Sequence, residues 1–254
     1  MRRILILGGT TEARGLAERL AGRTELDITL SLAGRTTAPV ALPVPVRTGG
    51  FGGVKGLADY LLGERIGALI DATHPYAQVI SANAAEAARR TGVPFLAVHR
   101  PPWTKTSGDR WTEADDVAGV VVTLGQHSRR VFVALGRNEL APFVEAPQHH
   151  YLVRSVDPVE PPLPLPHVSY VTGRGPFSEA DDHALLVAHR IEVVVAKNSG
   201  GKATYGKIAA ARTLGLEVII LRRPPLPDTP AVATVDEAVA WLDQALTLAA
   251  ARGV

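Results

Sequence analysis

The sequence predicts an α/β protein made of two Rossmann-like, doubly wound domains with mainly parallel sheets. Short apolar runs, typical of buried parallel strands, alternate with helix-length segments along the chain. Similar residues recur at a constant spacing in the two halves, which indicates an internal duplication. A chain of 254 residues is long enough for two domains, which we expect at residues 1–128 and 129–254.

The first strand and helix are predicted from the opening run. Ile4 to Leu7 is a continuous apolar run that predicts a buried strand, and Gly8 and Gly9 then turn the chain. Thr10 or Thr11 can cap the helix that follows. The apolar stripe of that helix is Ala13, Leu16, Ala17 and Leu20.

The remaining elements follow from the same periodicities. In the first half we expect strands at residues 26–32, near 46, at 66–71 and at 94–98, and helices at 54–62 and 79–90. In the second half we expect strands at 131–135, 151–156, 168–172, 191–196 and 217–221. We expect helices at 178–189 and 236–251, and the end of a further helix at 206–214. Residues 157–167 are proline-rich and predict a stiff surface connection.

The duplication is most visible around a repeated Arg-Pro-Pro. Arg100-Pro101-Pro102 and Arg223-Pro224-Pro225 lie at the same spacing as Gly92 and Gly215. After each Arg-Pro-Pro sequence we expect a helix to start behind a threonine, which is Thr112 in the first half and Thr234 in the second. The cap of the second helix is Thr234 or Asp236. Chance similarity between two α/β segments is the alternative. Two facing domains predict a substrate cleft between them.

Composition excludes several classes of function. The chain is 46% hydrophobic and contains no apolar run long enough to cross a bilayer, so no membrane association is expected. It has no cysteine and its N-terminus enters a strand almost at once, so we expect a cytoplasmic protein without a signal peptide. The net charge of +2 is too small to indicate nucleic-acid binding. Its histidines and carboxylates form no spaced cluster, so no metal site is expected.

The turn after the first strand is a candidate phosphate-binding site. It is a relaxed version of the dinucleotide fingerprint, in which Thr10 replaces the middle glycine and its hydroxyl would contact phosphate. The helix N-terminus favours an anion there. The alternative is a tight turn without a ligand. The predicted cofactor-binding residues of this turn are Gly8, Gly9, Thr10, Thr11, Glu12 and Ala13.

The end of the second strand discriminates between nicotinamide cofactors. An Asp or Glu there would bind the ribose 2′-hydroxyl of NAD, but this chain has Ser31, Gly34 and Arg35. A hydroxyl and a guanidinium suit a 2′-phosphate, so NADPH is favoured. The alternative for Arg35 is a solvated loop residue. The glycine-rich segment 49–53 allows close approach to a flat ligand or is a flexible loop.

The loop after the strand at 66–71 carries candidate catalytic groups. Thr73, His74 and Tyr76 follow Asp71 directly and offer donors, including a group that titrates near neutral pH. We expect Thr73 to contact the cofactor and His74 or Tyr76 to deliver a proton. The alternatives are a histidine bonded to the backbone and a tyrosine used in packing.

Cations gather at strand ends in the second half, mixed with glycines. This combination suits phosphate or carboxylate, and together the cations imply an anionic ligand with several carboxylates, although each alone could be a surface charge. A Walker-type loop is not predicted, because position 203 is Ala. The predicted substrate-binding residues are Arg137, Arg174, Gly175, Lys197, Ser199, Gly200 and Lys202.

Four of these stretches resemble the precorrin-6A reductase family, which includes cobalt-precorrin-6A reductases. They occur in the family's order across nearly the whole chain, and the Asp-Ala-Thr-His-Pro-Tyr-Ala run is the specific one. The stretches are Gly8-Gly9-Thr10-Thr11-Glu12-Ala13-Arg14, Asp71-Ala72-Thr73-His74-Pro75-Tyr76-Ala77, Arg174-Gly175-Pro176-Phe177 and Lys197-Asn198-Ser199-Gly200-Gly201.

The resemblance implies NADPH-dependent reduction of one macrocycle double bond in precorrin-6A, a polycarboxylate tetrapyrrole of cobalamin biosynthesis, to give precorrin-6B. A hydride would go to C19 and a proton to C18, and transient contacts with neighbouring pathway enzymes are compatible with it. Alternatives are the same reduction on cobalt-precorrin-6A and a non-catalytic NADP-binding module. An epimerase or dehydratase is disfavoured, because no tyrosine has a lysine four places on.

Overall fold

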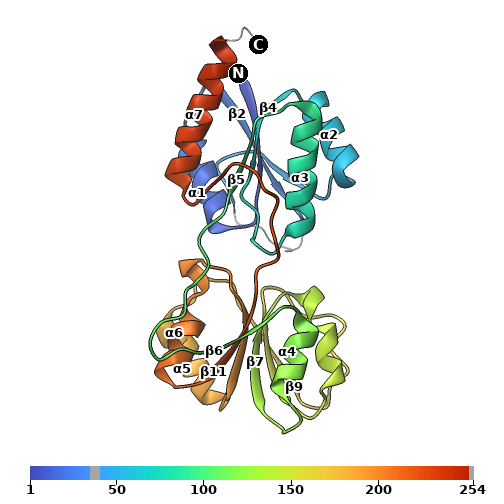
Figure 1. The fold of residues 1–254 in the computed structure, drawn as a ribbon, viewed down its shortest axis with the longest axis vertical. Helices are drawn as coiled ribbons and strands as arrows, with labels where there is room; N and C mark the ends of the chain where they lie inside the picture. Colours follow the sequence, from blue (N-terminus) through green and yellow to red (C-terminus); the bar gives the residue numbers. More distant parts are fainter. Residues whose placement is uncertain (35–40, 252–254) are drawn as a thin grey trace. The chain divides into compact units, whose positions relative to one another are not determined.

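The computed structural model describes residues 1–34 and 41–251 and divides the chain into two units. Unit 1 contains Met1–Pro101 and Pro224–Val254, and unit 2 contains Pro102–Arg223 (Figure 1). The boundary expected between residues 128 and 129 differs from both of these divisions. The chain changes unit at the two Arg-Pro-Pro sequences instead, so residues 102–128 belong to unit 2 and the last helix belongs to unit 1.

Unit 1 contains a parallel sheet of six strands in the order β12-β5-β4-β1-β2-β3. Its strands are β1 (Arg2–Leu7), β2 (Leu26–Leu32), β3 (Val46–Thr48), β4 (Ile66–Asp71), β5 (Phe95–Val98) and β12 (Ala231–Val232). The strand β1 lies between β2 and β4, so the chain winds outward from it in both directions. This reversal is the topological switch point at which ligands of open α/β sheets bind.

Helices cover both faces of this sheet. They are α1 (Thr11–Leu20), α2 (Gly53–Gly63), α3 (Gln78–Thr91) and α7 (Val235–Ala251). One core packs Leu16, Leu20 and Leu242 of α1 and α7 against β1 and β2. A second core packs Leu57 and Leu61 of α2 on the opposite face, with α3 beside them. The central strands β1 and β4 are therefore buried on both sides, as their apolar runs predicted.

Unit 2 repeats this strand arrangement in the order β6-β11-β10-β7-β8-β9, again parallel. Its strands are β6 (Arg110–Ala114), β7 (Arg130–Ala134), β8 (His150–Ser155), β9 (Val168–Thr172), β10 (Val193–Lys197) and β11 (Glu217–Leu221). Its helices are α4 (Val117–Leu124), α5 (Glu179–Ala188) and α6 (Gly206–Thr213), with 3-10 turns η1 (Arg137–Glu139), η2 (Ala141–Glu145) and η3 (Lys202–Thr204). The predicted pair of Rossmann-like halves is confirmed.

In each sheet, one edge strand belongs to the segment that follows a crossing of the chain from one unit to the other. After β5 the chain passes through Arg100-Pro101-Pro102 into unit 2, where β6 pairs with β11. After β11 it passes through Arg223-Pro224-Pro225 back into unit 1, where β12 pairs with β5. The two units therefore exchange their last strand and the helix that follows it.

Of the two helices expected to start behind a threonine, one differs from the structure. Thr112 lies within β6, and the helix begins only at Val117, where the side chain of Asp116 accepts the N–H of Gly119 at 2.7 Å. The helix α7 does start behind Thr234, whose hydroxyl accepts the N–H of Glu237 at 3.2 Å. The threonine cap was therefore correct in one half and wrong in the other, because an edge strand with mostly exposed residues occupies that position in unit 2.

Candidate functional site

The glycine turn of unit 1 lies at the switch point, directly after β1. A Cβ on Gly8 would come within 2.8 Å of Leu30 Cδ1 and 3.2 Å of Ala13 Cβ, so a larger residue here would force the Leu30 side chain on β2 to move. Gly9 has φ of +120°, and no atom lies within 4 Å of the position its Cβ would take. The backbone at Gly9 is therefore open to a close neighbour, and the first N–H groups of α1 follow it. This turn fits the pyrophosphate of a dinucleotide.

Thr10 caps α1 and ties it to the neighbouring strand loop. Its hydroxyl accepts the N–H of Ala13 at 3.1 Å and donates to the carbonyl of Ala72 at 2.7 Å. The single hydroxyl proton is thus used within the protein, which differs from the expected contact with phosphate. Thr10 instead fixes the turn relative to the loop after β4.

The next residues of the turn are held by an ion pair. Glu12 Oε2 lies 2.5 Å from Nη1 of Arg100, and the two side chains are only 19% and 12% exposed. Thr11 is exposed and donates its hydroxyl to Glu12 at 3.2 Å, while Ala13 is fully buried. The ion pair therefore connects the turn to the start of the crossing after β5.

The end of β2 carries a buried hydroxyl next to a cation. Ser31 is 5% exposed, and its Oγ lies 3.3 Å from Nη1 of Arg47 on β3. Gly34 has φ of +71° and lies against the Thr48 side chain. Arg35 lies outside the described residues. The sequence analysis missed Arg47, because the residue is distant in sequence and reaches this position only through the pairing of β2 with β3.

The loop after β4 places the predicted catalytic residues beside the glycine turn. The carboxylate of Asp71 accepts the N–H of Thr73 at 3.0 Å, and the Thr73 hydroxyl lies 3.3 Å from Ser81 Oγ. Nδ1 of His74 accepts the N–H of Tyr76 at 3.3 Å. The neutral imidazole therefore carries its proton on Nε2. Both rings are half-buried, with centroids 5.6 Å apart.

In unit 2 the equivalent switch point lies between β7 and β10. Glu139 Oε2 accepts the N–H of Gly136 at 2.9 Å and lies 2.5 Å from Nζ of Lys197. Arg137 lies beside them on η1, with Nη2 3.7 Å from Asp157. Sequence analysis predicted the two cations but missed the carboxylate between the strand ends. A negatively charged ligand would compete with Glu139 for Lys197.

Two further cationic loops are joined by backbone contacts. The N–H of Phe177 donates to the carbonyl of Ala203 at 3.0 Å, and a Cβ on Gly175 would lie 3.2 Å from the same carbonyl. The loop that carries Arg174 is thus fixed against η3, which begins with Lys202. Arg174 and Lys202 are exposed, whereas Ser199 is 8% exposed. The structure therefore brings the loops of Arg174 and Lys202 together.

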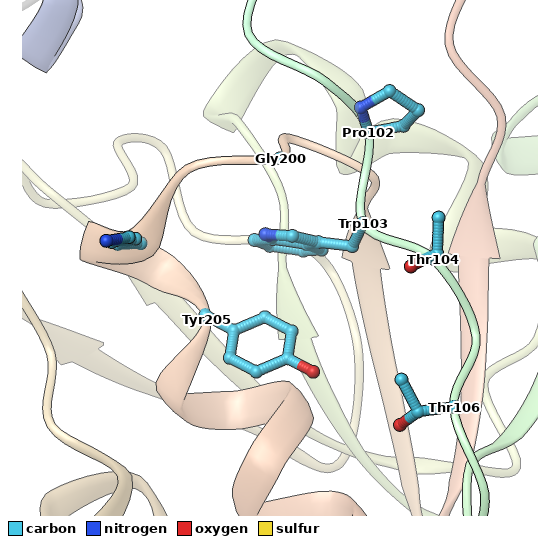
Figure 2. Close-up of a pocket in the computed structure, with 7 residues that line it drawn as sticks. Pro102, Trp103, Thr104, Thr106, Gly200 and Tyr205 are labelled. Atoms are coloured by element: carbon cyan, nitrogen blue, oxygen red, sulfur yellow. The ribbon is translucent and has the colours of Figure 1, made fainter.

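A cavity of about 370 Å³ opens beside η3. Figure 2 shows the indole of Trp103 next to the phenol of Tyr205, and their ring centroids are 5.5 Å apart. The cavity combines flat apolar walls, three hydroxyls and one cation, and only its glycine and lysine were predicted as site residues. It is lined by Pro102, Trp103, Thr104, Thr106, Gly200, Lys202 and Tyr205.

Beneath these loops lies a buried group of charges. Arg154 forms an ion pair with Asp182, with side chains 9% and 1% exposed. Lys207 on α6 is 4% exposed and donates to the carbonyl of Thr204 at 2.5 Å. Burial, reinforced by the charge of Arg154, lowers the pKa of Lys207 to about 7, although Asp182 opposes the shift.

The described residues contain neither a metal-binding cluster nor a membrane-spanning helix. No group of three or more His, Asp or Glu side chains in 1–34 and 41–251 is arranged to hold a metal ion. Over the same part of the chain, no helix is long and apolar enough to span a membrane.

The fold and its two switch-point sites define a Rossmann-like α/β protein of two units. The family model described as precorrin-6x reductase CbiJ/CobK matches residues 3–243. The chain belongs to this family, an oxidoreductase family of cobalamin biosynthesis, which confirms the resemblance seen in the sequence motifs.

Individual relatives agree with this assignment. The chain is 57% identical to a precorrin-6A reductase of Sinorhizobium sp., over 93% of this chain and 91% of that protein. A solved structure of a CobK precorrin-6A reductase superposes with a TM-score of 0.93 at 51% identity, covering 96% of this chain and 97% of the other. A more distant relative, the cobalt-precorrin-6A reductase of Priestia megaterium, is 28% identical over 93% of this chain and 96% of that protein.

Proposed function

We propose that this chain catalyses the NADPH-dependent reduction of a macrocycle double bond in precorrin-6A, giving precorrin-6B. The observation that carries this proposal is the open turn at Gly9, at the switch point of unit 1, beside a strand end without a carboxylate. Such a turn suits a dinucleotide, and the missing carboxylate favours the 2′-phosphorylated form. Membership of the precorrin-6x reductase family supports the reaction class.

The cofactor would be held by residues of unit 1. NADPH supplies the hydride, so the protein has to bind, orient and balance charge. The turn from Gly8 to Ala13 offers backbone N–H groups and the N-terminal end of α1 to the pyrophosphate. Ser31 and Gly34 lie at the strand end where the adenosine ribose is recognised in this fold. Thr73 lies in the adjoining loop, which Thr10 fixes to the turn.

The substrate would be held by residues of unit 2. Precorrin-6A is a flat macrocycle with many carboxylates, and Arg137, Arg174, Lys197 and Lys202 offer cations to them. Glu139 neutralises Lys197 before substrate binds. In the cavity beside η3, the rings of Trp103 and Tyr205 suit an apolar contact, and Lys202 with Gly200 suits a peripheral carboxylate.

The proton would come from the loop after β4. In its neutral form the imidazole of His74 carries its proton on Nε2, because Nδ1 accepts a backbone N–H. Nε2–H is therefore the group that His74 can offer as a donor. Tyr76 is the second candidate, since its ring lies beside that of His74.

The relatives favour the metal-free substrate. The relative at 57% identity is named for precorrin-6A, whereas the one named for cobalt-precorrin-6A is 28% identical. We therefore propose precorrin-6A as the substrate.

The test is an anaerobic incubation of the full-length protein with NADPH and either metal-free or cobalt-bearing substrate, followed at about 340 nm, where reduced nicotinamide absorbs. We expect NADPH consumption and a product heavier by two hydrogens with the metal-free substrate. Consumption with only the cobalt-bearing substrate would assign the other reaction. Binding of NADPH without consumption on either substrate would indicate a non-catalytic module.

A further inference from the structure

In unit 1 the strand β3 places a cation, Arg47, beside the carboxyl end of β2, where this fold distinguishes NADP from NAD. In the parallel pairing of β2 and β3, Arg47 lies opposite Ser31. Nη1 of Arg47 comes within 3.3 Å of Ser31 Oγ. Because Ser31 accepts this N–H, its own hydroxyl proton can be donated to a ligand. The strand end therefore offers one fixed positive charge and one hydroxyl side by side.

The guanidinium of Arg47 is held in a defined orientation. Nη1 donates to the carbonyl of Gly49 at 2.6 Å and Nη2 donates to that of Gly50 at 2.7 Å. Its Cζ lies 3.8 Å from the centroid of the Phe51 ring, and Phe51 in turn meets the edge of Tyr60. Because the two carbonyls and the ring already fix the Arg47 side chain, a ligand that binds it would cost little side-chain entropy.

The orientation leaves part of the guanidinium for a ligand. Within the described part of the chain, Arg47 donates three hydrogen bonds, to Ser31, Gly49 and Gly50, whereas a guanidinium carries five N–H groups. The N–H of Nε and the second N–H of Nη2 lie along the remaining edge of the guanidinium. This edge has the geometry that binds a phosphate through two parallel N–H bonds.

We propose that Arg47 is the residue that makes this protein select NADPH over NADH, by binding the 2′-phosphate together with the Ser31 hydroxyl. The inference rests on the proposed use of a nicotinamide dinucleotide in unit 1 and names the group that reads its phosphate. Position supports Arg47, because the end of β2 is where this fold reads the ribose 2′ substituent. Charge supports it, because residues 31–37 contain no carboxylate that would repel a phosphate.

The experiment measures binding, not turnover. NADPH and NADH are titrated by calorimetry into the full-length wild type and into Arg47→Ala, Arg35→Ala and Arg89→Ala. Arg89 on α3 is an exposed arginine of the same unit, so its removal matches the change in net charge. Arg35→Ala tests the arginine that the sequence analysis favoured.

We expect Arg47→Ala to weaken NADPH on the order of 30-fold and to change NADH less than about threefold, since only NADPH loses a charged hydrogen bond. Arg89→Ala should change neither. An equal loss for both cofactors would show that Arg47 only shapes the loop at Gly49 and Gly50. A selective loss in Arg35→Ala with none in Arg47→Ala would assign the phosphate to Arg35. Either result overturns the inference.

A second variant and the wild type separate the remaining outcomes. If Arg47→Ala fails to fold, Arg47→Gln replaces it, because the amide can still donate to a backbone carbonyl but carries no charge; the same selective loss is expected. If the wild type binds neither cofactor, or binds both equally, the proposed cofactor and the inference both fail. If the wild type prefers NADPH and Arg47→Ala keeps that preference, only the inference fails.

Discussion

The side-chain amide of Asn198 hydrogen-bonds both backbone polar groups of Trp103. Oδ1 accepts the N–H at 2.7 Å, and Nδ2 donates to the carbonyl at 3.0 Å. On the other side, the backbone carbonyls of Asn198 and Ser199 accept the guanidinium of Arg223 at 2.8 and 3.0 Å. The loop after β10 therefore holds the segment that enters unit 2 and the residue at which the chain leaves it.

Replacing Asn198 with Ala should lower the free energy of unfolding of unit 2 by about 1–3 kcal/mol, because two partly buried backbone groups of Trp103 lose their partner. Urea unfolding followed by tryptophan fluorescence measures the loss. Asn138→Ala, at an exposed position of η1, is the control and should have little effect. If the two variants unfold at the same urea concentration, the amide does not stabilise this segment.

Replacing Thr10 with Ala should destabilise α1 by about 1–2 kcal/mol, since the helix loses its cap and the bond to Ala72. Hydrogen exchange of the first amides of α1 measures this directly. Thr10→Ser keeps the hydroxyl and should exchange like the wild type. Thr11→Ala removes an exposed hydroxyl and serves as the control; faster exchange in Thr11→Ala than in Thr10→Ala would contradict the assignment of the cap.

Lys207 should make stability depend on pH. Its pKa is about 7 in the folded protein against 10.5 as the ordinary value, so below pH about 7 it is charged in both states and its burial cost is fully present. Above that pH only the unfolded chain keeps the proton, and the free energy of unfolding should rise by up to about 1.4 kcal/mol per pH unit.

Urea unfolding of the wild type and Lys207→Met between pH about 6 and about 9 isolates this contribution. The wild type should gain stability relative to the variant as the pH rises. Lys105→Met removes an exposed lysine of the same unit and should leave the slope unchanged. Parallel profiles for wild type and Lys207→Met would mean that Lys207 stays charged in the folded protein.

Glu139→Gln should strengthen the binding of the anionic substrate. Gln keeps an acceptor for the N–H of Gly136 but no longer neutralises Lys197. We expect KM for precorrin-6A to fall on the order of threefold at low salt, about 0.7 kcal/mol, and the difference to shrink as salt is added. Glu145→Gln, at an exposed position of η2, is the control. A raised KM would show instead that Glu139 positions Lys197 for the substrate.

His74→Ala should lower kcat by a factor on the order of 100 or more and change the pH profile of turnover, as expected for loss of a proton donor. NADPH affinity, measured separately, should stay within about threefold, since the turn at Gly8 and Gly9 is untouched. His127→Ala removes an exposed histidine of unit 2 and controls for the substitution. An unchanged kcat and pH profile would exclude His74 and leave Tyr76 or water.

Most of the fold was predictable because its central strands are short, buried apolar runs. The strands β1, β4, β7 and β10 show this pattern, and the helices between them follow the 3.6-residue period. The strand β6 was missed, since only Ala114 in it is buried and its charged residues give no alternation. The strand β12 was missed because it is only two residues long.

The domain boundary was wrong for a different reason. Arg100-Pro101-Pro102 and its repeat were recognised, but local sequence does not reveal that β6 pairs with β11 or β12 with β5. Site residues show the same limit. Strand-end residues such as Lys197 and Ser31 can be recognised in the sequence. Their partners, Glu139 for Lys197 and Arg47 for Ser31, are distant in sequence and come close only because neighbouring strands pair.

The exchange of the sixth strands has a consequence for synthesis on the ribosome. The sheet of unit 1 cannot be completed when its first hundred residues emerge, because β12 and α7 follow the whole of unit 2 in the sequence and are translated after it. The uninterrupted segment of unit 2 is finished first, although its chain begins later. A nascent chain stalled before residue 231 would therefore present β5 as an open edge, while unit 2 already holds all six of its strands.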